Sequence, residues 1–282
     1  MKLFETLLSK IKNLFKKPAA PETPVTAEAT EEKLSFRRLE NKNNAFTVSN
    51  KKPYTEDGVL KPKTIDTVFD FAYKMAFSEE GEHRDHRSGG SYQRKNGEIF
   101  ANTFQGKIAE CAACNLFYKI DPSVYPDFSV CPLGEWDTVD LKVKGKEIAV
   151  KSTKHFGQLL LLETKDWDEN GRYIPNTEKE TNTYDFLVLI RLNPSCEDVL
   201  KKQRLLYSEH TDRETLHRII SEQKWSYNYA GFITRSDLIY IIKNKYILPQ
   251  GALLNGKTLM DAENYYVQAI NLRNISEITG LI

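Results

Sequence analysis

The feature that most constrains the fold is a pair of alternating segments, 138–144 and 147–152, joined by a glycine-containing turn. Apolar and polar residues alternate in both segments, which is typical of strands with one buried and one polar face. Gly145 and Lys146 stand between them and indicate a tight β-hairpin. The chain therefore has to build a sheet that covers one face of this hairpin.

The turn also predicts which residues of the two strands face each other. With Gly145 and Lys146 as the two-residue loop, Asp140 pairs with Lys151 and Lys142 pairs with Ala149. We therefore expect a polar face that carries Asp140, Ala149 and Lys151 and is otherwise free of large apolar groups. The core face is predicted to consist of Leu141, Val143, Ile148 and Val150.

The segments around the hairpin alternate between helical and strand patterns. Thr64 and Ser236 are expected to cap two of the helices. The mixture predicts an α/β fold with a mixed central sheet flanked by helices. Helices are expected at about 64–78, 98–118 and 237–243, strands at 159–164, 184–192, 227–233 and 265–268, and a mostly polar helical insertion near 198–223.

The first 34 residues differ in composition from the rest. Residues 1–17 predict an amphipathic helix, residues 18–34 hold three prolines and predict a disordered linker, and residues 35–282 predict the folded domain. We expect the helix to dock on a partner protein or a second copy of the chain, with an anionic membrane surface as the weaker alternative. Its apolar stripe consists of Leu3, Phe4, Leu7, Leu8, Ile11, Leu14 and Phe15.

Charge and cysteine content narrow the function classes. The formal net charge is +1 for 282 residues, so any binding of nucleic acid has to rest on local basic patches. The four cysteines follow no secretory signal, which favours a reduced, cytoplasmic setting. No apolar run reaches the roughly 18 residues that a membrane span needs.

The residue types on the predicted polar face suggest metal-assisted chemistry. Asp140 offers the hard oxygen ligands that Mg²⁺ prefers. Lys151 can orient an attacking water and stabilise charge that develops on a phosphate. An exposed ion pair between the two is the plainer alternative, worth less than about 1 kcal/mol.

Together these elements resemble the PD-(D/E)XK nucleases, the superfamily of restriction endonucleases. The resemblance rests on the sequence GKIAE at 106–110, Asp140 at the start of a strand, and IAVKSTK at 148–154. It implies a Mg²⁺-dependent endonuclease that hydrolyses DNA, with Glu110 and Asp140 on the metal and Lys151 beside the water. It also implies a role in restriction or another defence against foreign DNA.

Ala149 departs from the pattern of that family. The position two residues before the lysine carries an acidic metal ligand in the family, and alanine cannot bind a metal. The ligand has been lost naturally, supplied from elsewhere in the chain, or replaced to inactivate the enzyme; the intact surroundings favour replacement. Glu147 is a poor substitute near the turn, and Asp137 is a rival to Asp140.

DNA contacts are expected outside the hairpin as well. Arg84, Arg87 and Arg94 belong to a basic, glycine-containing loop that can grip phosphates, although a mobile solvated loop is an equal alternative. Lys154 and Gln158 follow the motif closely and are candidates for contact with the DNA backbone. Two other functions stay open: a catalytically dead DNA-binding or assembly subunit, and a scaffold recruited through its N-terminal helix.

The spacing of Cys111 and Cys114 also matches a zinc-binding motif. The helix around them is rich in core residues, and no second Cys or His pair stands at zinc spacing. We therefore expect two buried small side chains at these positions.

Overall fold

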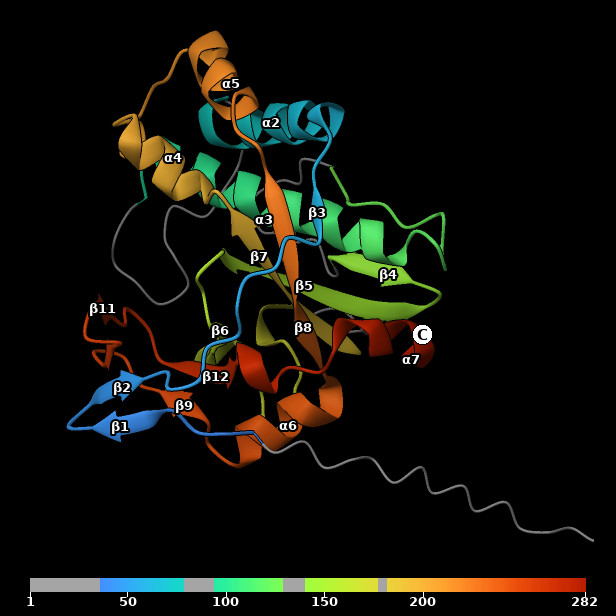
Figure 1. The fold of residues 1–282 in the computed structure, drawn as a ribbon, viewed down its shortest axis with the longest axis vertical. Helices are drawn as coiled ribbons and strands as arrows, with labels where there is room; N and C mark the ends of the chain where they lie inside the picture. Colours follow the sequence, from blue (N-terminus) through green and yellow to red (C-terminus); the bar gives the residue numbers. More distant parts are fainter. Residues whose placement is uncertain (1–35, 79–93, 129–139, 177–181) are drawn as a thin grey trace, which may run out of the picture. The chain divides into compact units, whose positions relative to one another are not determined.

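The computed structural model describes residues 36–78, 94–128, 140–176 and 182–282. Within these ranges the chain is a mixed α/β protein with six helices and three sheets, as Figure 1 shows. The predicted N-terminal helix at 1–17 lies outside the described residues. No helix in the described part combines the length and the apolar character of a membrane span.

A five-stranded central sheet organises the molecule, in the order β3-β8-β7-β5-β4. β5 and β7 run parallel, and all other neighbours in this sheet are antiparallel, so the sheet is mixed as predicted. Its strands are β3 (Gly58–Val59), β4 (Leu141–Val143), β5 (Lys146–Lys154), β7 (Phe186–Asn193) and β8 (Ser226–Thr234).

The two smaller sheets are built from short strands. One has the order β6-β12-β9 and the other β1-β2-β10-β11. The predicted third strand, β6, therefore forms but does not join the central sheet. These strands are β1 (Glu40–Lys42), β2 (Ala45–Thr47), β6 (Leu159–Glu163), β9 (Ile247–Leu248), β10 (Leu253–Leu254), β11 (Thr258–Leu259) and β12 (Asn264–Gln268).

The helices form near the predicted places, but two caps differ. The first helix begins at Pro62 and not at Thr64, because proline fits the first helical position, where no backbone donor is needed. Thr234, and not Ser236, caps the helix at 235–243, since Asp237 completes a capping box with it. The helices are α2 (Pro62–Phe77), α3 (Asn96–Phe117), α4 (Cys196–Lys202), α5 (Arg213–Ser221), α6 (Arg235–Lys243) and α7 (Ile278–Leu281).

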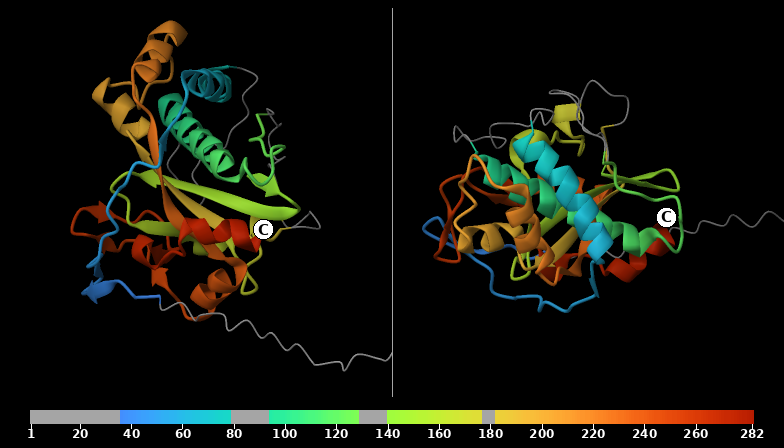
Figure 2. Two further views of the ribbon diagram at one scale, coloured as in Figure 1. Left: turned by 45° about the vertical axis from the view of Figure 1, so that its right-hand side comes forward. Right: turned by 90° about the horizontal axis from the view of Figure 1, so that it is seen from above.

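The central sheet separates two hydrophobic clusters. The helix-side cluster joins α2 and α3 to the face that carries Ile148 and Val188. The sheet-side cluster joins α6 and the β6-β12-β9 sheet to the face that carries Ala149 and Leu187. Figure 2 shows α2 and α3 on one side of the central sheet and the β6-β12-β9 region on the other. Burial of apolar surface on both faces is the main stabilising contribution to this arrangement.

The region predicted as a polar surface insertion, 198–223, is part of the core. It contains α4 and α5, and α5 packs against α2. Leu216 and Ile220 on α5 are buried in the helix-side cluster. The polar majority of this segment concealed a narrow apolar stripe, which is enough to hold a short helix.

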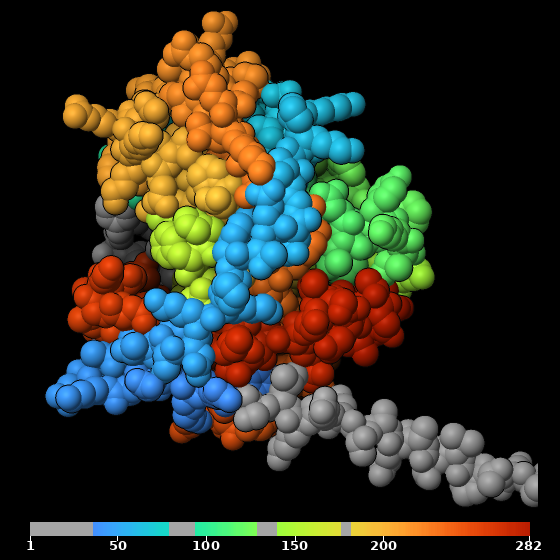
Figure 3. Space-filling view, in the orientation of Figure 1, coloured from blue at the N-terminus to red at the C-terminus, as the bar shows by residue number. Residues whose placement is uncertain are grey.

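Residues 49–57, which we call the strap, connect the small β1-β2 hairpin to β3. Figure 3 shows the strap lying across the middle of one face of the molecule. It is held by contacts to distant residues: the backbone N–H and C=O of Lys52 bond the Gln158 side chain at 2.8 and 3.1 Å, and the Lys52 amine bonds the Ala230 carbonyl at 2.7 Å. The strap therefore lies over strands β7 and β8 on the surface of the molecule.

Candidate active site at the β4–β5 hairpin

The hairpin forms, but its register differs from the predicted one. Each β4 residue lies opposite a β5 residue two positions earlier in the chain than predicted. Leu141 lies opposite Ile148, and Lys142 lies opposite Glu147, so the predicted pairing of Lys142 with Ala149 is wrong. The central turn residues are Lys144 and Gly145, with φ of 45° and 83°. A turn with two positive φ values favours glycine at its second position, and this preference places the turn one residue earlier.

The predicted assignment of the hairpin residues to the two faces of the sheet still holds. Side chains alternate between the faces, so a register shift of two residues keeps each side chain on its face. Leu141, Val143 and Ile148 are buried in the helix-side cluster, which confirms them as core residues. Continuing the observed register past Leu141 sets Asp140 opposite Ala149, and not opposite Lys151. In this register Ala149 is thus the direct cross-strand neighbour of the aspartate.

Asp140 lies where β4 separates from β5. Its Oδ2 atom accepts a hydrogen bond of 2.6 Å from the backbone N–H of Val150. The carboxylate thereby takes the place that a further carbonyl of β4 would hold in the ladder. No partner of the other oxygen, Oδ1, is found in the described part of the chain.

Lys151 is partly buried on the same strand, two residues beyond Ala149. It pairs with Leu189 of the parallel strand β7, and this pairing puts it on the face of the sheet-side cluster. Among the residues that the structure describes, none forms a hydrogen bond or ion pair with its amine. A partly exposed cation without a partner among the described residues is a candidate for binding an anionic ligand.

Ala149 is not on an open polar face. It is only 1% exposed and belongs to the sheet-side cluster with Leu187 and Leu189. The prediction of a face free of apolar groups is therefore wrong at this position. Strands β6 and β12 and helix α6 cover the face, and periodicity within the hairpin could not have shown this.

Glu110 lies on α3, on the opposite side of the central sheet from Ala149. Its Oε2 atom is 2.6 Å from the amine of Lys107, which also bonds the carbonyl of Asp127 at 2.7 Å. Both side chains of this ion pair are largely buried. The structure therefore shows Glu110 in an ion pair with Lys107 and not in contact with Asp140 among the described interactions.

Lys107 was not among the predicted site residues, although the sequence contains a signal for it. Residues three apart on a helix are neighbours, so Lys107 in the sequence GKIAE is placed to pair with Glu110. The amine also lies 5.2 Å from the centre of the Phe71 ring and 5.7 Å from that of Phe128. These contacts attach the segment that leads toward Asp140 to α3.

Two of the predicted DNA contacts already have partners. The amine of Lys154 lies 2.7 Å from Asp198 and 3.3 Å from Glu197 on α4. Partial burial alone would lower the pKa of Lys154, but the two carboxylates outweigh burial and raise it. The Gln158 amide is occupied by the strap. A phosphate would have to displace these partners.

The basic loop is only partly described. Arg84 and Arg87 lie outside the described residues. Arg94 directly precedes Lys95, the N-cap of α3. At about 1.5 Å per residue, Arg94 is roughly 24 Å along the helix from Glu110. The predicted phosphate grip and the predicted catalytic end are therefore separated by most of the length of α3.

In comparisons with known proteins, no family model matches the chain, and neither a curated protein nor a solved structure matches it. The arguments about its site therefore rest on the geometry described above.

Proposed function

We propose that this chain has the architecture of a Mg²⁺-dependent endonuclease that hydrolyses DNA, with its reacting end at Asp140 and Lys151. We infer that Ala149 leaves the site one ligand short, so that the chain as written cuts DNA little or not at all. A role in restriction or another defence against foreign DNA belongs to the same proposal. The supporting observation is that Asp140 and Lys151 flank position 149 and that both keep polar atoms without partners in the described residues.

The described residues alone do not fit a tightly held magnesium ion. Mg²⁺ prefers octahedral oxygen ligands, usually including carboxylates. Asp140 supplies one carboxylate, whereas Glu110 is paired with Lys107 on the other side of the sheet. The described part of the chain contains no group of three or more His, Cys, Asp and Glu side chains placed to hold a metal.

A carboxylate at position 149 would change this donor set. Residues directly opposite in an antiparallel pair have Cα atoms about 4.5–5.5 Å apart, so an aspartate there shares a ligand with Asp140. Lys151 would then stand next to the ion, where its amine can stabilise negative charge on a phosphate oxygen. Only the aspartate at position 149 has to be introduced, because Asp140 and Lys151 are already in place.

The test compares the chain as written with Ala149→Asp, Ala149→Asn and Ala149→Asp/Lys151→Ala. We expect Mg²⁺ binding by calorimetry in the two variants that carry the aspartate, and cleavage of plasmid DNA only in Ala149→Asp. Asparagine has the same shape without the charge, so it controls for the change of size. The double variant should still bind Mg²⁺ but not cleave, which also excludes a contaminating nuclease.

Two outcomes would contradict the proposal. Strong cleavage by the chain as written would mean that position 149 is not the missing ligand. A folded, DNA-binding Ala149→Asp protein that stays inert with Mg²⁺ and Mn²⁺ would favour the second candidate.

The second candidate is a catalytically dead DNA-binding or assembly subunit. The burial of Ala149 beside Leu187 favours it, because alanine suits an apolar environment and a carboxylate does not. This candidate predicts DNA binding without cleavage in every variant.

Salt dependence separates both candidates from a scaffold that does not bind DNA. Replacing Arg84, Arg87 and Arg94 with alanine should weaken DNA binding and reduce the slope of log K against log salt by up to about 0.9 for each lost phosphate contact. An unchanged slope would count against this loop as the phosphate grip.

A further inference from the structure

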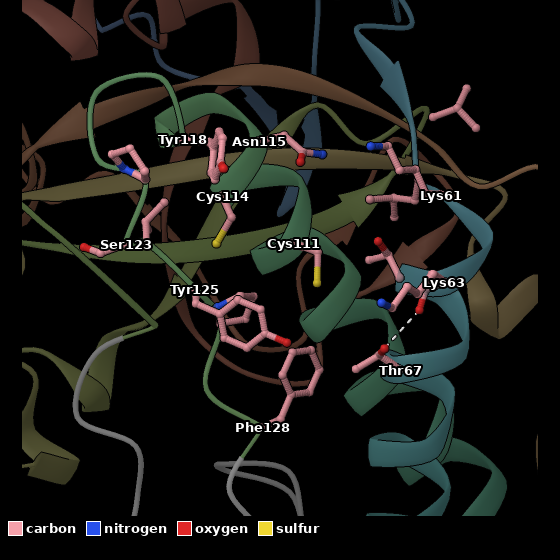
Figure 4. Close-up of a pocket in the computed structure, with 16 residues that line it drawn as sticks. Lys61, Lys63, Thr67, Cys111, Cys114, Asn115, Tyr118, Ser123, Tyr125 and Phe128 are labelled. Atoms are coloured by element: carbon pink, nitrogen blue, oxygen red, sulfur yellow. Dashed lines mark hydrogen bonds between the residues drawn. The ribbon is translucent and has the colours of Figure 1, made fainter.

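A pocket of about 680 Å³ lies between the start of α2, the C-terminal half of α3 and the segment 118–128. Figure 4 shows its walls: the start of α2 on one side, the segment after α3 on the other, and α3 between them. None of its lining residues belongs to the proposed nuclease site. A volume of roughly 300–1,000 Å³ is typical of pockets that bind small molecules.

The wall after α3 is aromatic and exposed. Tyr118 and Tyr125 line the pocket, and their exposed fractions are 61% and 70%. Phe128 completes this wall and is held from behind by the Lys107 amine, 5.7 Å from its ring centre. Large exposed rings around a cavity favour a ligand with a flat face on which they can stack.

The floor of the pocket is formed by two thiols of α3. Figure 4 shows the sulfur atoms of Cys111 and Cys114 between the two walls. Burial raises the pKa of each thiol to about 12, so both are neutral near pH 7 and behave as small apolar groups. The floor therefore suits an uncharged ring and does not supply a nucleophile.

The α2 wall is positively charged. Lys61 and Lys63 line the pocket, no carboxylate is among the lining residues, and neither lysine has an ion-pair partner in the described part of the chain. Both stand at the start of α2, whose first turn contains no acidic residue. Lysines are unfavourable at a helix N-terminus, because its partial charge is also positive. An anion bound there would relieve this repulsion.

The nearby carboxylates do not neutralise these lysines. Asp66 lies 2.9 Å from His217, and Glu110 lies 2.6 Å from Lys107. Asp121 accepts hydrogen bonds from Ser123. Each of these acidic groups has another partner and none of them lines the pocket, so the lining itself carries two lysines and no carboxylate.

We propose that this pocket binds a nucleoside phosphate. The base would stack against Tyr118 and Tyr125 above the two thiols, and the phosphate would bind Lys61 and Lys63. The pocket joins an uncharged aromatic part to a cationic part, and a nucleotide presents the matching groups in one molecule. This inference does not depend on the nuclease proposal.

The test measures binding of the four ribonucleoside monophosphates to the full chain by calorimetry. Adenosine and inorganic phosphate, used alone, separate the contributions of the base and of the phosphate. We expect at least one nucleotide to bind more tightly than either fragment. Tyr125→Ala should weaken that binding by roughly fivefold or more, because stacking of one base contributes about 1–3 kcal/mol.

A matched pair of variants tests the cationic wall. Lys61→Gln with Lys63→Gln should weaken nucleotide binding by roughly tenfold or more, since hydrogen bonds to charged groups contribute about 1.5–3 kcal/mol. Lys74→Gln, near the other end of α2, should leave it nearly unchanged. Adenosine binding should not respond to either change.

A tyrosine readout locates the ligand independently. Nucleotide should slow the iodination of the exposed rings of Tyr118 and Tyr125, followed by mass spectrometry at each site. The inference is overturned if no nucleotide binds at millimolar concentration, or if binding ignores the lysine and tyrosine variants. It is also overturned if inorganic phosphate binds as tightly as the nucleotide, or if a second copy of the chain covers the tyrosines.

Discussion

Lys151 and Arg191 are two cations on neighbouring strands and on the same face of the central sheet, yet their surroundings are opposite. β5 and β7 run parallel, with Lys151 beside Leu189 and Thr153 beside Arg191. Arg191 is fully buried and donates to the Asn228 side chain and to the carbonyls of Lys52 and Pro53, at 2.5 to 2.8 Å. Lys151 is partly exposed and forms no such bond within the described residues.

The difference teaches how to separate a structural cation from a functional candidate. A buried charge is tolerated only when its donors are satisfied, and the strap satisfies those of Arg191. Asn228 is held in turn by Asp57, 2.8 Å away. Within the described residues the amine of Lys151 has no comparable set of acceptors, which makes it the functional candidate of the two. Four predictions test this contrast.

The largest effect is expected at Arg191. Arg191→Met should destabilise the folded chain by about 3 kcal/mol or more, because two strap carbonyls and Asn228 lose their donors in a buried place. Urea denaturation measures this loss. Arg191→Lys keeps the charge but loses the several N–H donors of the guanidinium group. It should therefore be more stable than Arg191→Met but less stable than the unchanged chain. A loss below about 1 kcal/mol would show that the strap does not depend on Arg191.

The second effect is expected at Ala149, which is buried two residues before Lys151 on the same strand. Ala149→Asp should cost roughly 2 kcal/mol in the presence of a chelator, because it puts a carboxylate into an apolar cluster. Excess Mg²⁺ should restore part of this stability if the ion binds Asp140 and the new aspartate. Thermal unfolding with and without Mg²⁺ measures both the loss of stability and its recovery by the metal. Ala149→Asn should lose stability but gain nothing from the metal.

A smaller effect is expected at Lys154, a cation whose partners are carboxylates at the surface. Lys154→Ala should cost roughly 0.5–1 kcal/mol near neutral pH. The pKa of Lys154 is raised above 10.5, so its contribution is complete below pH 10.5 and is lost as the pH rises through the raised pKa. Denaturation at several alkaline pH values should show a smaller decline in Lys154→Ala than in the unchanged chain.

The smallest effect is expected at Lys151. Lys151→Ala should change the free energy of unfolding by less than about 0.5 kcal/mol, because no described contact is lost. The same change should abolish cleavage in the Ala149→Asp background. A large loss of stability in Lys151→Ala would instead identify Lys151 as a structural residue like Arg191.

The sequence predicted the elements of the hairpin better than their exact pairing. Alternation identified Leu141, Val143 and Ile148 as core residues, and the structure confirms them. The predicted register was wrong by two residues, because it placed Gly145 and Lys146 at the centre of the turn. A turn of the observed type favours glycine at its second central position, which makes Lys144 and Gly145 the central residues. The sequence itself therefore contains the signal for the observed register, with Gly145 as the second turn residue.

The candidate site was less predictable. The spacing of Lys107 and Glu110 could have shown their ion pair, since it depends only on helical geometry. The occupied state of Gln158 could not have been predicted, because its partner, Lys52, is more than one hundred residues away in the chain.

By itself the sequence determined the mixed α/β character, the positions of most helices and strands, and the alternation of the hairpin residues. These properties depend on neighbours along the chain, and periodicity and turn chemistry report such neighbours directly. The tertiary structure alone decided that Ala149 is covered by apolar residues and that Glu110 lies on the other side of the sheet. It also decided that the donors of Arg191 find acceptors, whereas the described residues offer none to Lys151. Each of these depends on which distant segment covers a face, and no local pattern encodes that choice.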